Sequence, residues 1–358
     1  MNFLESAKEN LFQFTKLESF QKDYYNKHLV CYKFVPTQQN KIILDEHFNS
    51  VGHTVLKENY VTSLRLSDEN FELPESHFFN DVDDVRITKH PRYSFPIMHL
   101  HSFFEVLFVF SGQCINVIDG KNLIFSGGDL CIIPPKVEHS VYVKDDETIV
   151  LNILIKISTF DQVFTTLLKS SNILSVFFNE ILYSNQFHKY LVCSTGNDEI
   201  LKEIILRMFQ ACEGKGQYYS EIMNGYFAVF VGTLLQHHED HVKYPPGYFD
   251  KYSEVSQMLN YILVNSTHIT LKDCAKKFHF SERYLSLILK KHTGKSFSQL
   301  VTSAKIEMAK ELLRYNHVNL AILAEKAGYK DPAYFTKVFK RETGCTPTIY
   351  KNQFSPAP

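Results

Sequence analysis

The C-terminal part of the chain contains one sequence unit twice. The first copy, "LKDCAKKFHFSERYLSLILKKHTGKS", runs from Leu271 to Ser296, and the second, "LAILAEKAGYKDPAYFTKVFKRETGCT", runs from Leu320 to Thr346. Matching residues are 49 positions apart, and 50 apart after one inserted residue near Lys330. A unit of this length that occurs twice predicts two copies of one small supersecondary structure.

Each copy is typical of two short helices joined by a tight turn. In the first copy, Ser281 is a good N-cap for the second helix, and Gly294 follows that helix where a left-handed residue ends the last turn. In the second copy, Asp331 is the N-cap, Pro332 fits the first helical position, and Gly344 ends the helix. The pattern predicts two helix-turn-helix motifs, in which the second helix can enter a DNA major groove.

The two predicted second helices have an apolar face and a basic face. In the first of them we expect Tyr284, Leu285, Ile288 and Leu289 to form the buried stripe. The opposite faces carry cations that can neutralise phosphates. These are Arg283, Lys290 and Lys291 in the first copy and Lys337, Lys340 and Arg341 in the second.

The charge of the chain is divided unevenly. Residues 251–358 hold 17 Lys and Arg against 8 Asp and Glu, a net charge of +9, whereas residues 1–250 hold 21 against 31, a net charge of −10. Lysine-rich helices that only present solvated faces would explain the excess equally well on charge alone. Two helix-turn-helix motifs inside the basic segment favour binding to double-stranded DNA.

The segment "AEKAGYKDPAYFTKVFKRETGCTPTIYK" resembles the C-terminal signature of the AraC/XylS-type transcription regulators, and the resemblance covers about residues 255–352. It implies two recognition helices that enter successive major grooves, roughly 34 Å apart. Carried over residue by residue, the base-contact positions are Arg283, Ser286, Leu287, Pro332, Ala333, Thr336 and Lys337.

Some of the transferred base-contact positions are apolar, and one turn residue departs from the family pattern. Leu287 and Pro332 have no side-chain hydrogen bond to offer, so apolar contact with thymine methyl groups is the most they supply directly. His279 stands where the family usually has glycine in the turn of the first motif. Histidine tolerates a positive φ better than most residues, so we expect a mild stability penalty.

Residues 86–157 are typical of short strands separated by turns. Asp119-Gly120 predicts a two-residue hairpin, because both central positions need a positive φ. Pro134-Pro135 should end the preceding strand. The spacing favours an antiparallel sandwich or barrel.

Possible metal ligands occur at the start of this region. His99, His101 and Glu105 are all odd-numbered, so they would share one face of a strand. A straight strand, however, would place Glu105 about 13 Å beyond His101. Both can serve one ion only if Ser102–Phe104 turns or bulges.

The order HxH, three residues, E, six residues, G resembles the first cupin motif, and "GDLCIIPPKVEH" resembles the second, with His139 at the fourth ligand position. N and O donors suit Fe, Mn, Ni or Zn. We expect no metal or other cofactor, because Lys136 adds a cation where the motif has glycine. We expect instead that a pocket with a small polar effector, such as a sugar, is lined by His99, His101, Phe103, Glu105, Phe125 and His139.

The expected class is an α+β multidomain protein, with an antiparallel cupin-like β barrel, a helical dimerisation segment and an all-α tandem helix-turn-helix domain. Helices near 198–213 and 218–238 are the candidates for the subunit contact. His237, His238 and His241 lie near the end of the second helix, where we expect them to interact with the helix dipole and not to bind a metal. The expected boundaries are 1–85 (role unknown), 86–160 (effector-sensing barrel), 161–240 (helical segment), 241–252 (linker) and 253–358 (DNA-binding domain).

The sequence predicts a cytoplasmic homodimer that regulates transcription and is not an enzyme. There is no signal-peptide pattern, no apolar run of the roughly 20 residues that span a bilayer, and no CxxC pair among the seven cysteines. Promoter DNA, a small effector and RNA polymerase are the expected partners, and no membrane contact is expected. Two alternatives stay open: a metal-dependent cupin enzyme or metal sensor fused to a DNA-binding domain, and a constitutive DNA-binding protein without an effector.

Overall fold

The computed structural model describes residues 3–27, 72–73, 75–80, 83–94, 98–157, 173–174, 177–178, 181, 190–214, 216–244, 249–315 and 319–354. The chain divides into two compact units. Residues 1–157 and 188–245 form the first unit, and residues 158–187 and 246–358 form the second. Among the described helices, none is both long and apolar enough to cross a membrane.

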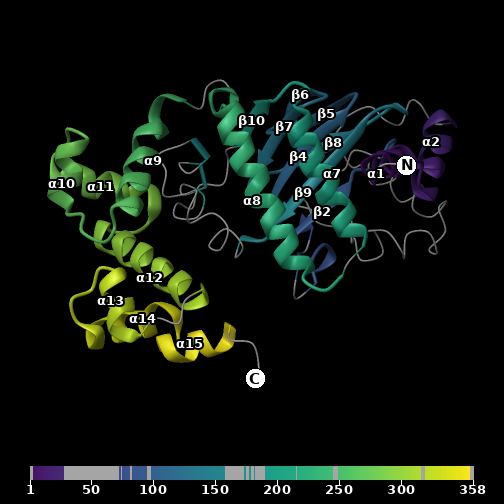
Figure 1. Cartoon of the computed structure of the whole chain (residues 1–358). Helices are drawn as coiled ribbons and strands as arrows, with labels where there is room; N and C mark the ends of the chain where they lie inside the picture. The colour runs from purple at the N-terminus through teal and green to yellow at the C-terminus, as the bar shows by residue number, and fades with distance from the viewer. Residues whose placement is uncertain are drawn as a thin grey trace. The chain divides into compact units, whose positions relative to one another are not determined.

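Two antiparallel sheets form the body of the first unit (Figure 1). The larger has the strand order β10-β7-β4-β9-β2 and the smaller the order β6-β5-β8. The strands are β2 (Val85–Lys89), β4 (Phe104–Ser111), β5 (Gln113–Ile118), β6 (Lys121–Ser126), β7 (Asp129–Ile133), β8 (His139–Tyr142), β9 (Ile149–Ile155) and β10 (Leu191–Ser194). A separate parallel pair joins β1 (Glu72–Leu73) to β3 (Leu100–His101). The predicted antiparallel β fold is confirmed.

Local signals explain where these strands turn. The hairpin between β5 and β6 is made by Asp119 and Gly120, whose φ angles of 51° and 69° match the predicted turn. Strand β7 ends immediately before Pro134. Leu107 and Val109 of β4 belong to a fully buried apolar cluster that also contains Cys131 of β7. This cluster is the core of the unit.

Strand β10 was not predicted, since helices were expected throughout residues 161–240. It pairs antiparallel with β7, with Val192 opposite Cys131. Four residues are too few to show a period, and the partner strand lies about sixty positions earlier in the chain, so no local signal marks it. The predicted linker also begins inside the fold, because Lys243 forms an isolated bridge with Val192. Residues 245–248 of that linker lie outside the described residues.

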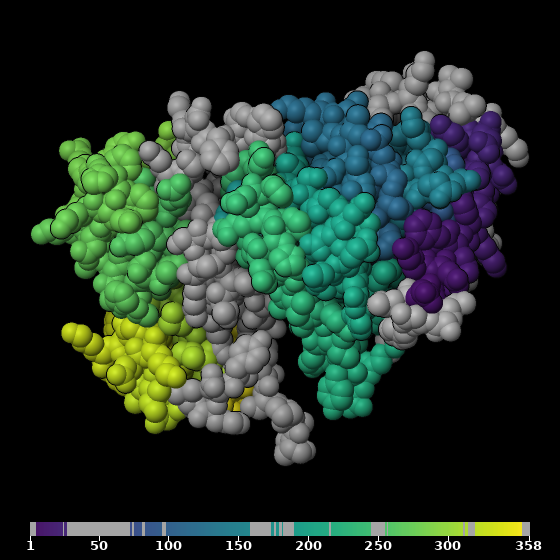
Figure 2. Space-filling model, turned by 45° about the horizontal axis from the view of Figure 1, so that its top comes forward, coloured from purple at the N-terminus to yellow at the C-terminus, as the bar shows by residue number. Residues whose placement is uncertain are grey.

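Helices flank the sheets of the first unit. They are α1 (Phe3–Phe12), α2 (Lys16–Lys27), α7 (Glu199–Glu213) and α8 (Tyr219–His238), with short 3-10 turns η2 (Glu75–His77) and η3 (Glu239–His241). The bounds of α7 and α8 agree with the two helices predicted near 198–213 and 218–238. Both contact β2, and they lie side by side in Figure 1. Figure 2 shows the N-terminal helices, in purple, against the strand region.

The second unit is helical, as predicted. Its helices are α9 (Phe249–Val264), α10 (Leu271–Lys277), α11 (Glu282–Thr293), α12 (Phe297–Tyr315), α13 (Leu320–Lys326), α14 (Pro332–Thr343) and α15 (Pro347–Phe354). Ser281 caps α11 by accepting a hydrogen bond from Tyr284 N, and Asp331 caps α14 by accepting one from Ala333 N. Gly294 and Gly344 end these helices with φ angles of 70° and 82°. The four predicted end signals are therefore confirmed.

The tight turns of the two motifs have the same backbone conformation. His279 has a φ of 58°, and Gly328, which is 49 positions later, has a φ of 76°. A Cβ on Gly328 would lie 2.7 Å from the carbonyl oxygen of Thr267, so glycine is required there by contact as well as by φ. The first turn holds a histidine in the conformation that the sequence predicted.

Candidate DNA-binding surface and buried histidine cluster

Helix α11 is held in place by its apolar side. Leu285 and Leu289 are fully buried in a cluster with residues of α9, α10 and α12. Tyr284, expected in this stripe, is instead 48% exposed, because its position lies one step round the helix toward solvent. Of the predicted DNA-contact residues of α11, Ser286 is half-buried and the exposed ones are Arg283, Leu287, Lys290 and Lys291.

Helix α14 repeats this arrangement. Phe335, Val338 and Phe339 are buried against α12 and α13 residues. The predicted contact residues on the other side are Pro332 and Thr336, which are half-buried, and Ala333, Lys337, Lys340 and Arg341, which are exposed. The hydroxyl of Thr336 donates to the carbonyl of Pro332 at 2.9 Å, and Arg341 pairs with Glu342 at 2.8 Å. Lys337 and Lys340 make no ion pair with any residue that the structure describes.

The two helices present equivalent residues at equivalent positions. Ser286 corresponds to Thr336 and Lys290 to Lys340, each pair being 50 positions apart. A short polar group near the helix start and a lysine near its end suit one contact to a base edge and one to a phosphate. The two helices therefore present the same pair of side chains at the same helical positions.

The histidine cluster lies at a bend in the first unit. The chain bends at Ser102 and Phe103, between β3 and β4. As a result the Nε2 atom of His101 lies 3.4 Å from Oε2 of Glu105, rather than the length of four extended residues. Nε2 of His139 lies 3.8 Å from the same oxygen. A turn or bulge at Ser102–Phe104 is needed if His101 and Glu105 are to share one site, and the structure has this bend.

His99 joins the cluster through the backbone. Its N–H donates to the carbonyl of His139, and the N–H of His139 donates back, at 3.0 and 2.9 Å. The side-chain ligand atoms of His99, Glu105 and His139 all lie within 4.8 Å of one another. The rings of His99 and His139 are 4.3 Å apart, so His99 forms the half-buried edge of the cluster.

Backbone contacts fix the tautomers of the two buried imidazoles. Nδ1 of His101 lies 2.7 Å from the carbonyl oxygen of Phe103, and Nδ1 of His139 lies 3.0 Å from that of Val137. A carbonyl can only accept, so each Nδ1 carries a proton, and a ring with one proton presents a bare Nε2 toward Glu105. Both Nε2 atoms and Oε1 of Glu105 are buried without a hydrogen-bond partner. Only acceptors converge on this point.

The protonation states sharpen this imbalance. Burial lowers the pKa of His101, and Glu105 only partly offsets the effect, so this ring stays neutral. Burial also raises the pKa of Glu105, but contacts with His101 and His139 outweigh it and hold the pKa well below its usual range. The cluster is thus a buried, ionised carboxylate beside two buried imidazoles. Such a site is stabilised by a cation or by hydrogen-bond donors from a ligand.

His90 belongs to the same environment and was missed in the sequence. Burial lowers the pKa of His90 to about 4, while the negative charge of Glu105 opposes the shift. Its Nε2 lies 2.9 Å from the hydroxyl of Ser94. It comes nine residues before the first histidine of the motif, on the chain that leaves β2, so only the pairing of β2 with β9 brings it near.

The two phenylalanines of the predicted pocket, Phe103 and Phe125, lie in different parts of the first unit. Phe103 is fully buried, and its ring stacks on His101 with centroids 4.3 Å apart. Phe125 belongs to the core between the sheets, a different cluster from that of Phe103. Lys136 has a φ of 61°, which explains the glycine of the motif, and its side chain is exposed. Its ammonium is therefore no obstacle to a cation among buried ligand atoms.

A second group of possible ligands lies where α7 begins and α8 ends. Asp198 caps α7 and accepts hydrogen bonds from His237 Nδ1 at 3.1 Å and His238 Nε2 at 2.8 Å. Burial raises the pKa of Asp198, but the two imidazoles and the helix N–H groups outweigh it and lower the pKa to about 2. Here two imidazole N–H groups donate to one carboxylate, so the hydrogen bonding of this group needs no metal ion.

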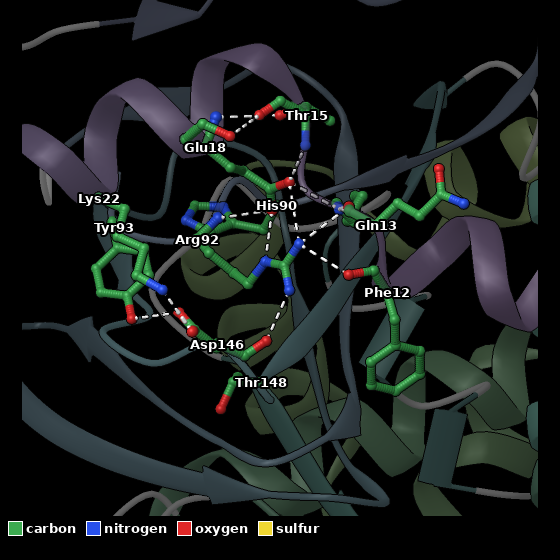
Figure 3. A network of polar contacts seen from close by, with 12 residues as sticks. Phe12, Gln13, Thr15, Glu18, Lys22, His90, Arg92, Tyr93, Asp146 and Thr148 are labelled. Atoms are coloured by element: carbon green, nitrogen blue, oxygen red, sulfur yellow. Dashed lines mark hydrogen bonds and ion pairs between the residues drawn. The ribbon is translucent and has the colours of Figure 1, made fainter.

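The N-terminal helices are fixed to the sheets by buried charges (Figure 3). Glu18 of α2 is fully buried and accepts hydrogen bonds from Arg92 Nε at 2.9 Å and Lys89 Nζ at 2.9 Å. Arg92 also donates to the carbonyl of Asp146 at 2.6 Å, and the carboxylate of Asp146 pairs with Lys22 of α2 at 2.5 Å. Part of the region with no predicted role, residues 3–27, is therefore an integral layer of the first unit.

Comparison with known proteins matches both units. Residues 83–172 match the AraC-like ligand binding domain, and residues 274–353 match a helix-turn-helix domain. The transcriptional activator RhaR of Cronobacter sakazakii is 24% identical over 264 residues, which cover 72% of this chain and 87% of that protein. The HTH-type transcriptional regulator YtdP of Bacillus subtilis is 34% identical over 105 residues, 29% of this chain but 14% of that protein. The structure of ToxT from Vibrio cholerae is 13% identical over 76% of this chain and 100% of its own, with a TM-score of 0.31.

The relatives that match along most of their length are named as regulators of transcription, and the two matched domains follow the order predicted from the sequence. The tandem motif with its exposed basic helices and the strand-built first unit agree with this assignment. The chain is an AraC-type transcription regulator, with an N-terminal ligand-binding domain and a C-terminal helix-turn-helix DNA-binding domain.

Proposed function

We propose that this regulator binds promoter DNA sequence-specifically through α11 and α14, and that a ligand in the first unit controls it without chemical turnover. The observation that carries the proposal is the repeated presentation of a short polar residue and a lysine on both helices. Lys337 and Lys340 are exposed and free of partners among the described residues, so their charge is available to a polyanion. Each phosphate contact contributes salt-dependent affinity.

Substitution of α14 tests the DNA contacts. Lys337→Gln should weaken binding to a promoter fragment about tenfold, with lost protection confined to a few base pairs in a footprint, because a base contact discriminates by about 1–3 kcal/mol. Lys340→Gln should weaken promoter and random DNA alike and reduce the salt slope by about one. Lys121→Gln removes an exposed lysine from β6 of the other unit and should leave binding unchanged. Equal effects of all three substitutions would contradict the assignment.

The proposal includes a homodimer through the outer face of α8. Ile222 and Val229 are 46% and 53% exposed on this face, seven residues apart. Gly225 and Gly232 are on the same face with the same spacing, and a Cβ on either would meet no atom within 4 Å. Each glycine costs the helix about 1 kcal/mol relative to alanine, and the unit itself does not require either.

The spacing of these residues is self-complementary. If two copies of α8 pack antiparallel, a register that puts Val229 opposite Gly225 of the partner subunit also puts Ile222 opposite Gly232 of the partner subunit. Both pairs have their midpoint at position 227, so one two-fold axis generates all the contacts. Each bulky side chain then faces a glycine, which permits close approach of the helices.

Cysteine cross-linking tests this register. Oxidation of the Gly225→Cys/Val229→Cys double variant should yield a covalent dimer, because each new cysteine faces the other across the axis. In the Ile222→Cys control the two copies of the new cysteine are offset by ten residues, about 15 Å, and should not cross-link. Equal cross-linking of both variants, or a monomer in sedimentation, would exclude this interface.

The buried cluster supports a second candidate, the sensing of a divalent metal such as Fe, Mn, Ni or Zn. His101, Glu105 and His139 offer only acceptors, and His99 lies beside them. Two metal–ligand bonds of about 2.1 Å at a tetrahedral angle place ligand atoms about 3.4 Å apart, close to the separations between these imidazoles and the carboxylate. A sugar would supply hydroxyl donors instead, but both Nε2 atoms are fully buried. Burial favours the ion.

Metal content decides between these ligands. Protein prepared without chelators should hold about one metal ion per chain by elemental analysis, and EDTA should lower its thermal stability. Glu105→Gln should lose the ion, whereas Glu138→Gln, beside His139 but exposed, should keep it. Metal-free protein whose stability rises with a sugar would favour the polar effector.

A further inference from the structure

The two sheets of the first unit leave a groove between their edge strands. Strand β6 is the edge of the smaller sheet and β10 the edge of the larger one. The groove encloses about 680 Å³, and residues of β6, β7, β10, α8 and η3 line it. Small-molecule sites commonly measure about 300–1,000 Å³. The groove is separate from the histidine cluster, none of whose residues lines it.

One wall of the groove is apolar. Leu123 and Phe125 of β6 turn toward the core, whereas Ile124 between them is 64% exposed. Val192 of β10 is only partly buried. A large exposed side chain such as Ile124 beside a cavity of this size gives a flat apolar group a surface to cover.

The opposite wall carries positive charge and imidazole groups. Lys243 is exposed and forms no ion pair with any residue that the structure describes, while its backbone is fixed by two hydrogen bonds with Val192 at 2.9 and 2.8 Å. His238 and His241 line the same wall. The one carboxylate of the lining, Asp129, already accepts a hydrogen bond from the N–H of Ser126 at 2.7 Å. An apolar wall facing an unpaired ammonium suits an organic anion.

We propose that this groove binds an organic monoanion with a flat or extended apolar body, such as an aromatic carboxylate, and that this molecule is the effector. The second clause rests on the proposed function. The apolar body covers Leu123, Ile124 and Val192, and the carboxylate pairs with Lys243, with His241 as a hydrogen-bond donor. A sugar fits poorly, because the β6 wall offers it no hydrogen-bonding side chain.

The groove is connected to the helices of the proposed dimer face. His238, in the groove wall, donates from Nε2 to Asp198, and Asp198 accepts from the N–H groups of Ile200 and Leu201 at the start of α7. A ligand that moves His238 therefore acts on the C-terminal end of α8 and the N-terminal end of α7 together. A ligand that contacts His238 differently in two arrangements of these helices would shift their populations.

Binding of 2-naphthoate to the full chain tests the site. Isothermal titration should show one saturable site, and the neutral analogue 2-naphthylmethanol should bind about tenfold more weakly, because it cannot pair with Lys243. Lys243→Gln should weaken naphthoate binding by the same factor and leave the alcohol unchanged. Lys121→Gln is the matched control, since it removes an exposed lysine from β6 outside the groove lining. Ser194→Trp fills the groove from β10 and should abolish binding of both compounds.

The outcomes separate the site from the regulator. Equal affinity for acid and alcohol, or affinity that neither Lys243→Gln nor Ser194→Trp reduces, overturns the groove proposal. Promoter binding without naphthoate binding also overturns it and leaves the regulator standing. If naphthoate binds as expected, it should change promoter affinity in the parent protein and not in Ser194→Trp. Binding with no change in promoter affinity overturns the effector role.

Discussion

The buried carboxylate of Glu18 should make the attachment of the N-terminal helices depend on pH. Burial raises the pKa of Glu18, but hydrogen bonds from Arg92, Lys89 and the backbone outweigh it and lower the pKa from 4.5 to about 2. A carboxylate with a depressed folded-state pKa stabilises the fold above its unfolded pKa, and this stabilisation is lost as pH falls toward the folded value. A shift of this size corresponds to about 3.4 kcal/mol at pH 7, about 2.6 at pH 4 and about 1.4 at pH 3.

Glu18→Gln should therefore destabilise the protein by about 3–5 kcal/mol at pH 7, because it also leaves the charges of Arg92 and Lys89 buried without their partner. Urea unfolding followed by far-UV circular dichroism measures the difference, since the chain has no tryptophan. The difference between parent and variant should shrink by about 1 kcal/mol between pH 7 and pH 4. Glu9→Gln, an exposed carboxylate of α1, should change stability by less than about 0.5 kcal/mol. A Glu18→Gln effect below about 1 kcal/mol at pH 7, or one that does not vary with pH, would refute this reasoning.

Four further substitutions have expected effects on unfolding in urea. Gly328→Ala should cost more than about 2 kcal/mol, because its Cβ would meet the Thr267 carbonyl at 2.7 Å in a left-handed turn, whereas His279→Gly should change stability by less than about 1 kcal/mol. Gly112→Ala should be similarly destabilising, since its Cβ would clash with Thr148. Asp331→Ala removes the N-cap of α14 and should cost about 1 kcal/mol and weaken promoter binding. Stability equal to that of the parent protein in Gly328→Ala, Gly112→Ala or Asp331→Ala would count against these assignments.

Local chemistry explains most of what the sequence predicted. The caps, the end glycines and the hairpin at Asp119-Gly120 each depend on a few neighbouring residues, so their positions were accessible from the chain alone. The left-handed conformation of His279 was expected from the glycine that the family has at this turn position, not from neighbouring residues. The basic faces of α11 and α14 follow from helical spacing once the motif is recognised.

Features that depend on distant contacts were not accessible in this way. Strand β10 forms because it pairs with the free edge of β7. Glu18 is buried because it is paired with Arg92, which lies 74 residues further along the chain. The predicted pocket contained Phe103 and Phe125 together, but Phe103 lies in the bend before β4 and packs with Phe78 and Phe79, whereas Phe125 packs in the core between the sheets. The groove between β6 and β10 likewise exists only where the two sheets meet.

Helix α12 has a consequence for the DNA that this regulator can read. It is continuous from Phe297 to Tyr315, about 28 Å long, and it packs against both motifs. The distance and angle between the recognition helices are therefore built into one rigid element, unlike in proteins whose two motifs are joined by a flexible linker. Adding five base pairs between the two recognised segments would turn the second onto the opposite side of the duplex. One protomer should therefore tolerate base changes in either segment far better than any change in the spacing between them.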